Sequence, residues 1–224
     1  MNGIRALLTV AVMLFGAVSA HAQGIPGQGT WETTLQARDV GNTGTTNAFY
    51  DTVLGITWLR DANVNGLMDW NTAMSWASTL TVGGVGGWRL PNMTNSLPGD
   101  SGAYSSSEMA SLFFDSLGNR TNPNVYLLSN TGRFQNVQDY AYWSSLEYAT
   151  STDNAWDFNI HFGSQQTYFK SNEFYAMAVH PGDVGTVVAS VPEPETYAML
   201  LAGLGLIGAV ARRRHSDMCL TARS

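Results

Sequence analysis

In this 224-residue chain, the sequence Ala155-Trp156-Asp157-Phe158-Asn159-Ile160-His161-Phe162 gives the clearest indication of fold class. Its large apolar side chains alternate with polar ones, which is the period of a β-strand with one face in a core and the other in water. Residues 165–169 and 174–179 follow closely and are expected to be its hairpin neighbours. The second half of the domain is therefore predicted to be an antiparallel sheet.

Short strands and a first helix are predicted in the earlier half of the chain. Residues 30–37 alternate as a first strand would, and residues 48–51 and 55–59 are typical of a short strand pair. Asp69 is expected to cap a helix that ends before the glycine-rich residues 83–87. The apolar face of that helix comprises Trp70, Ala73, Met74, Ala77 and Leu80.

A second helix is predicted from a capping box formed by Ser105 and Glu108. The side chains at helical spacing behind it are Met109, Leu112, Phe113 and Leu117. Two helices early in the chain and antiparallel strands late indicate an α+β domain over residues 23–183.

The N-terminus has the form of a secretory signal. Arg5 precedes an apolar run, and Ala20-His21-Ala22 is a small-x-small cleavage site. Residues 1–22 are therefore predicted to be a signal peptide, so that the mature chain begins near Gln23.

The C-terminus has the form of a membrane anchor. Residues 196–211 carry no charge and span about 24 Å as a helix, which is a transmembrane helix if the bilayer thins slightly. Arginines favour the cytoplasmic side, so the domain is expected outside the inner membrane, with residues 184–195 as a linker and 215–224 as a cytoplasmic tail. The arginines concerned are Arg212, Arg213 and Arg214.

Charge and cysteine content narrow the possible partners. Residues 23–190 hold 14 acidic and 6 basic side chains, a balance that argues against nucleic acid and anionic polysaccharide as partners. Neutral glycans, cations and proteins remain possible partners. The one cysteine, Cys219, lies in the predicted cytoplasmic tail, so the exported domain has no disulfide and must be stabilised by packing.

Two aromatic motifs are candidates for ligand binding. Trp88 with Arg89, and Tyr142 with Trp143, are predicted either to line a sugar site or to form the core. In the second interpretation Arg89 ties a carboxylate to backbone carbonyls.

One segment follows the start of a calcium loop. Oxygen-bearing side chains occupy positions 1, 3, 5 and 9, and glycine occupies position 6, but Thr72 stands where a bidentate Glu would be needed. The alternative is a turn rich in Asp and Asn that leads into a helix cap. The four candidate ligands are Asp61, Asn63, Asn65 and Asp69. A weaker metal hypothesis uses the polar face of one strand, with Asp157, Asn159 and His161.

Catalytic motifs are not found in the exported part. It contains no Cys, and the sequence shows no G-x-S-x-G elbow, no H-E-x-x-H pair and no phosphate loop. We therefore expect a protein that is not an enzyme and that holds no cofactor.

The C-terminal segment resembles the PEP-CTERM sorting signal of Gram-negative bacteria, here at residues 192–214. The likeness rests on Val191-Pro192-Glu193-Pro194, the short apolar helix and the arginine triplet. It implies that an exosortase, a membrane-embedded processing enzyme, is a partner, and it implies a producer of exopolysaccharide. The chain departs from the family pattern by continuing beyond the arginines to Ser224.

Residues 49–184 resemble the DUF1566 family, also called the Lcl C-terminal domain. The likeness rests on residues 54–58, Trp88-Arg89-Leu90-Pro91, Tyr142-Trp143-Ser144-Ser145, Ala155-Trp156 and Ala178-Val179-His180-Pro181-Gly182. His180 stands where the family usually has Arg. The resemblance implies a fold similar to C-type lectins and a role in adhesion, including glycan binding.

These observations predict an exported, membrane-tethered protein of the cell surface or extracellular matrix. Its expected ligands are an extracellular polysaccharide or another matrix protein. Two alternatives stay open, a hydrolase that acts on exopolysaccharide through a carboxylate pair and a purely structural matrix component.

Overall fold

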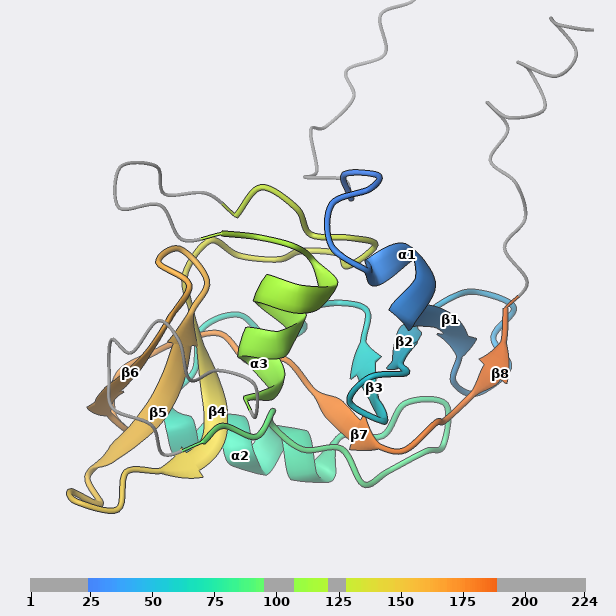
Figure 1. Ribbon diagram of the computed structural model, residues 1–224. Helices are drawn as coiled ribbons and strands as arrows, with labels where there is room; N and C mark the ends of the chain where they lie inside the picture. The colour runs from blue at the N-terminus through green and yellow to red at the C-terminus, as the bar shows by residue number, and fades with distance from the viewer. Residues whose placement is uncertain (1–23, 95–106, 121–127, 189–224) are drawn as a thin grey trace, which may run out of the picture. The chain divides into compact units, whose positions relative to one another are not determined.

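The computed structural model describes residues 24–94, 107–120 and 128–188 (Figure 1). The chain divides into two units, Met1–Thr186 and Val187–Ser224, and the architecture below belongs to the first. The predicted signal peptide, the predicted transmembrane helix, Ser105 and the sorting signal lie outside the described residues. Within the described ranges, no helix has the length and apolar character needed to cross a membrane.

A five-stranded sheet forms one part of the domain, in the order β7-β3-β2-β1-β8. The predicted strand pair is confirmed, because β2 and β3 are antiparallel and set Phe49 opposite Trp58. Both of these rings are buried. The strands are β1 (Leu35–Asp39), β2 (Ala48–Asp51), β3 (Ile56–Leu59), β7 (Val179–Pro181) and β8 (Thr186–Val187).

The strand predicted at residues 30–37 is wrong in its first half. The short helix α1 (Trp31–Thr34) comes first, and β1 begins only at Leu35. The carbonyl of Thr30 accepts hydrogen bonds from the backbone N–H groups of Thr33 and Thr34. This turn buries the Trp31 ring, and that burial outweighs the local preference for a strand.

A three-stranded antiparallel sheet forms the other part, with β5 between β4 and β6. The strand predicted at residues 165–169 is confirmed as the partner of β5. The strands are β4 (Ala141–Glu147), β5 (Asn154–Asn159) and β6 (Ser164–Phe169).

The expectation that one face of β5 meets water is wrong. Asp157 and Asn159 are buried, as are Trp156 and Phe158 on the opposite face. The face of β5 that carries Asp157 and Asn159 is covered by helix α2 and by the residues before β7. Trp143 and Phe174 belong to one core cluster there. Strand β5 is therefore covered on both sides.

Residues 174–179 do not form the predicted hairpin with β5. Phe174 instead pairs with Met68, Tyr175 pairs in parallel with Tyr142 of β4, and Val179 pairs with Trp58 of β3. The segment therefore links the two sheets (Figure 1).

The first predicted helix is confirmed as α2 (Trp70–Thr79). Asp69 caps it, with Oδ1 accepting a hydrogen bond of 2.9 Å from the N–H of Thr72. The glycines that follow form a tight turn in which Val82 pairs with Val85.

The second predicted helix is present, but its cap differs. Helix α3 (Glu108–Ser111) continues into the π-helical turn η2 (Leu112–Ser116). The cap is Ser107, whose Oγ accepts from the N–H of Ala110, and not Ser105. Because Glu108 is the first helical residue rather than the third, its carboxylate is free to bind elsewhere.

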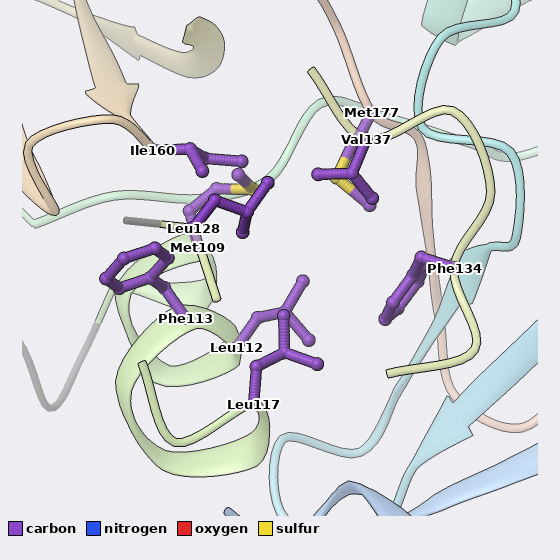
Figure 2. A pocket seen from close by; sticks show the side chains of 9 residues that line it. All are labelled: Met109, Leu112, Phe113, Leu117, Leu128, Phe134, Val137, Ile160 and Met177. Carbon is purple, nitrogen blue, oxygen red and sulfur yellow. The ribbon is translucent and has the colours of Figure 1, made fainter. Parts of the chain in front are cut away.

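The largest core cluster lies where α3 and η2 face the loop at residues 128–137, and it contains a small apolar pocket (Figure 2). Its free volume is about 10 Å³, which is at most the space of one water. The pocket is a packing gap between the side chains of Met109, Leu112, Phe113, Leu117, Leu128, Phe134, Val137, Ile160 and Met177.

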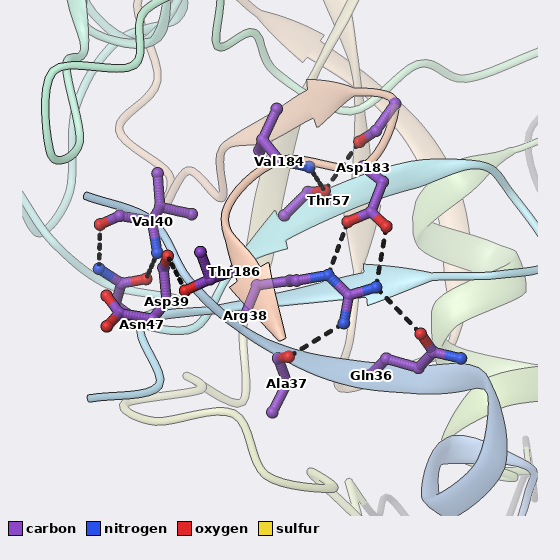
Figure 3. A network of polar contacts seen from close by, with 11 residues as sticks. Gln36, Ala37, Arg38, Asp39, Val40, Asn47, Thr57, Asp183, Val184 and Thr186 are labelled. Carbon is purple, nitrogen blue, oxygen red and sulfur yellow. Dashed lines mark hydrogen bonds and ion pairs between the residues drawn. The ribbon is translucent and has the colours of Figure 1, made fainter. Parts of the chain in front are cut away.

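A buried arginine fastens the first strand to the end of the domain (Figure 3). Arg38 is only 3% exposed, and its guanidinium donates to both carboxylate oxygens of Asp183, at 2.6 and 2.8 Å. It also donates to the Ala37 carbonyl and the Gln36 side chain. These contacts raise the pKa of Arg38, so the charge is permanent and paired.

We predict that Gly83→Ala destabilises the domain more than Gly84→Ala. Both glycines have positive φ, +55° and +85°, so alanine carries a backbone penalty of about 1–2 kcal/mol at either position. A Cβ at Gly83 also collides with Gly41 and the Val40 carbonyl, whereas a Cβ at Gly84 meets nothing within 4 Å. Urea unfolding of both variants measures the difference, and equal losses would contradict the close packing of Gly83 on Gly41.

We predict that Asp157→Asn gains stability relative to wild type as the pH rises. Burial raises the pKa of Asp157 from 3.8 to about 8, and neither carboxylate oxygen has a hydrogen-bond partner among the described residues. Between these values the unfolded chain loses the proton and the native chain keeps it, so the wild-type free energy of unfolding falls with pH and levels off above about pH 8. Melting curves at several pH values test this. A constant difference between the two proteins from about pH 4 to 8 would refute it.

Candidate functional site

The two tryptophans of the candidate sugar site lie in the core. Trp88 is 2% exposed, donates from Nε1 to the Val85 carbonyl and packs edge-on against His180. Trp143 is fully buried and donates from Nε1 to the Met68 carbonyl. Their faces contact protein, so a sugar ring has no access to them.

Tyr142 is equally inaccessible. Its ring is fully buried, and its hydroxyl accepts a 2.8 Å hydrogen bond from the N–H of Gln138. Burial raises the pKa of this hydroxyl, so the group stays protonated. Tyr142 and Trp143 are neighbours on β4 and point to opposite faces of the sheet, which excludes a shared platform.

Arg89 ties a carboxylate to a backbone carbonyl, as predicted for a motif that forms part of the core. Its guanidinium binds both carboxylate oxygens of Glu108, at 2.8 and 2.7 Å, and also donates to the Leu90 carbonyl. Glu108 accepts in addition from the N–H of Asn92 at 2.7 Å. The carboxylate therefore joins α3 to residues 89–92.

The structure brings the two aromatic motifs together through backbone contacts. Ser145 on β4 donates its N–H to the Pro91 carbonyl, and its hydroxyl donates to the Asn92 side chain. The motifs around Trp88 and Trp143 thus fasten α3, residues 89–92 and β4 to one another. This is a structural unit and not a ligand platform.

The candidate calcium ligands all have protein donors. Asp61 accepts from the N–H of Asn63 and from the Asn136 side chain, while Asn63 accepts from Gly66. The Asn65 oxygen, once its amide is oriented by its neighbours, accepts from Trp76 Nε1. Asp69 is occupied as the cap of α2. The pattern is accounted for by local turns and a helix cap.

The three polar residues of the weaker metal hypothesis are not brought to one open face. Asp157 is buried within β5, whereas His161 lies in the turn after it and contacts Asp139 through Nδ1 at 2.9 Å. Across the described ranges, no group of three His, Cys, Asp or Glu side chains is placed to hold a metal ion.

An exposed aromatic surface was not predicted from the sequence. Tyr140 and Tyr168 are 47% and 41% exposed, and each packs edge-on against Phe174, with ring centroids 5.7 and 5.3 Å from that ring. We call Tyr140, Tyr168 and Phe174 the tyrosine surface. The available signal was the alternation of Ser164, Gln166 and Tyr168 along β6, which sets them on one face.

We predict that Glu108→Gln lowers the free energy of unfolding by roughly 1.5–3 kcal/mol, the size of a hydrogen bond to a charged group. The substitution keeps the shape and removes the charge that Arg89 binds. Glu147→Gln is the matched control, because that carboxylate is 44% exposed and its pair with Lys170 contributes about 1 kcal/mol or less. Urea unfolding of both variants gives the comparison, and equal effects would contradict a special role for Glu108.

Two family models match the chain. The PEP-CTERM protein-sorting motif matches residues 190–214 and marks an exported, exosortase-sorted surface protein that is anchored to the membrane through its C-terminus. No curated protein matches the chain. The Lcl C-terminal domain matches residues 47–180. Since that match covers more than half of the sequence, the chain belongs to the Lcl C-terminal domain family.

Proposed function

We propose that this is a non-enzymatic protein of the cell surface or extracellular matrix that binds a glycan or a matrix protein. A signal peptide exports it, the helix at residues 196–211 holds it in the inner membrane, and an exosortase then sorts it. A fold similar to C-type lectins is part of the proposal. The observation that carries it is the sorting motif, which follows directly after the folded domain.

Binding is favoured over catalysis by the position of the perturbed acid. Burial raises the pKa of Asp157 to about 8, so this carboxyl group keeps its proton at neutral pH, as a general acid must. However, its side chain is fully buried in the middle strand of a sheet, out of reach of a polysaccharide. The apolar pocket of Figure 2 is also too small for a sugar.

The hydrolase alternative predicts a change in the substrate. If the protein cleaved exopolysaccharide, incubation with the polysaccharide of the producing strain would shorten its chains. Our proposal requires an unchanged chain length under the same conditions. A ligand-binding experiment distinguishes our proposal from the purely structural alternative, because only our proposal requires a ligand.

We predict that delivery to the surface depends on the exosortase. In a producing strain that lacks this enzyme, the full-length chain is expected to stay in the inner membrane and to be depleted from the surface several-fold, because the motif is no longer processed. Replacing Arg212, Arg213 and Arg214 by alanine should have the same effect, whereas lysine at these positions keeps the charge and is the control. Fractionation and immunoblotting measure the distribution. Equal surface amounts with and without the enzyme would refute the proposal.

A further inference from the structure

We propose that the tyrosine surface is the ligand site of this domain and that its ligand is a neutral polysaccharide. The inference rests on the proposed binding function and assigns it to Tyr140, Tyr168 and Phe174. Tyr168 lies on β6, at one edge of the three-stranded sheet (Figure 1), and both Tyr140 and Tyr168 pack on Phe174.

The rings of this surface pack on one another and on the core. Phe174 is 5% exposed and packs on the fully buried Trp143, with a centroid distance of 4.6 Å. Tyr140 and Tyr168 flank it edge-on, and Tyr140 also contacts Tyr175 at 6.3 Å. Rigid tyrosines provide a large contact area at a low entropic cost. Two of them beside one fixed phenylalanine are within reach of one short oligosaccharide.

Polar groups suited to sugar hydroxyls lie in the same strip. Gln166 and Ser164 share the face of β6 with Tyr168, and their side chains are joined by a 3.1 Å hydrogen bond. The hydroxyls of Tyr140 and Tyr168 have no hydrogen-bond partner within the described part of the chain. Aromatic faces for the C–H side of a pyranose and uncharged donors and acceptors for its hydroxyls are therefore close together.

The charges around this surface favour a neutral ligand over an anionic one. Lys170, the nearest cation along the chain, pairs with Glu147 and lies over the Trp70 ring at 4.4 Å. Glu173, next to Phe174, is exposed. An anionic polysaccharide would thus meet a carboxylate and no free lysine in this part of the chain, on an exported domain that is already acidic.

A protein partner fits this surface less well. A stable protein interface buries about 1,200–2,000 Å² around a central apolar anchor. Here Phe174, the most apolar member, is buried, and the exposed part consists of two half-exposed tyrosines beside Ser164 and Gln166. An exposed surface of two tyrosines beside uncharged polar groups is better matched to a sugar chain.

Affinity electrophoresis of the detergent-solubilised full-length chain tests the assignment. Gels contain a dextran, a mixed-linkage β-glucan or a galactomannan as neutral probes, and alginate as an anionic one. We expect at least one neutral polysaccharide to retard the wild-type protein and alginate to leave its mobility unchanged. Tyr140→Ala and Tyr168→Ala should each weaken the retarding interaction by roughly tenfold. Tyr168→Phe, which keeps the ring, should retain most of it.

Phe169→Ala is the matched control. Phe169 is 61% exposed and follows Tyr168 on β6, but it points to the opposite face of the sheet. Unchanged melting midpoints show that the variants are folded. An equal loss with Phe169→Ala, no loss with either tyrosine variant, or retardation by alginate alone would overturn the assignment. Binding of a matrix protein through the two tyrosines, with none to the neutral probes, would overturn the glycan as ligand. None of these results alters exosortase-dependent delivery, so the two proposals fail separately.

Discussion

The two sheets form one domain because a single buried segment pairs with both of them. Residues 174–181 exchange backbone hydrogen bonds with Met68 at one end and with Arg89 at the other. Between these points the segment pairs with β4 through Tyr175 and with β3 through Val179. Residues 176–179 are all at most 3% exposed. A buried backbone needs partners for its N–H and C=O groups, and this segment finds them in elements that are far apart in the sequence.

This constraint explains why the motifs that resemble the family are structural. Trp88 lies beside His180, Arg89 pairs with Val179, and Trp143 packs on Phe174, so both motifs close around the central segment. Their aromatic rings are buried by that packing. Residues that make a family recognisable are then poor guides to its ligands, because ligands contact what the packing leaves exposed.

Sequence patterns predicted features that are decided locally and missed those that depend on distant partners. The Asp69 cap and the apolar spacing of α2 depend on residues close together in the sequence, so the pattern alone was enough to predict the helix. The alternation around Asp157 correctly predicted a strand, but it could not show that α2 and Phe174 cover the polar-patterned face. Likewise, the oxygen pattern from Asp61 was read as a candidate calcium loop, because a sequence does not show which backbone N–H groups will satisfy those oxygens. The tyrosine surface was missed for the same reason: Tyr140 and Tyr168 are far apart in the sequence, and both pack on Phe174.

Strand β1 joins the first part of the domain to its last part, through residues other than those of the proposed ligand surface. The N-terminal residues enter the five-stranded sheet through β1, and the ion pair of Arg38 with Asp183 fastens the last part of the domain to that same strand. β1 lies three strands from β7 in the sheet, and the residues just before β7 pair with β4 through Tyr175. The tyrosine surface, of which Tyr168 lies on β6, is thus supported by different contacts from those that hold Asp183. Arg38 binds both carboxylate oxygens of Asp183, whereas Tyr140 and Tyr168 pack on Phe174, so different residues hold these two regions in place.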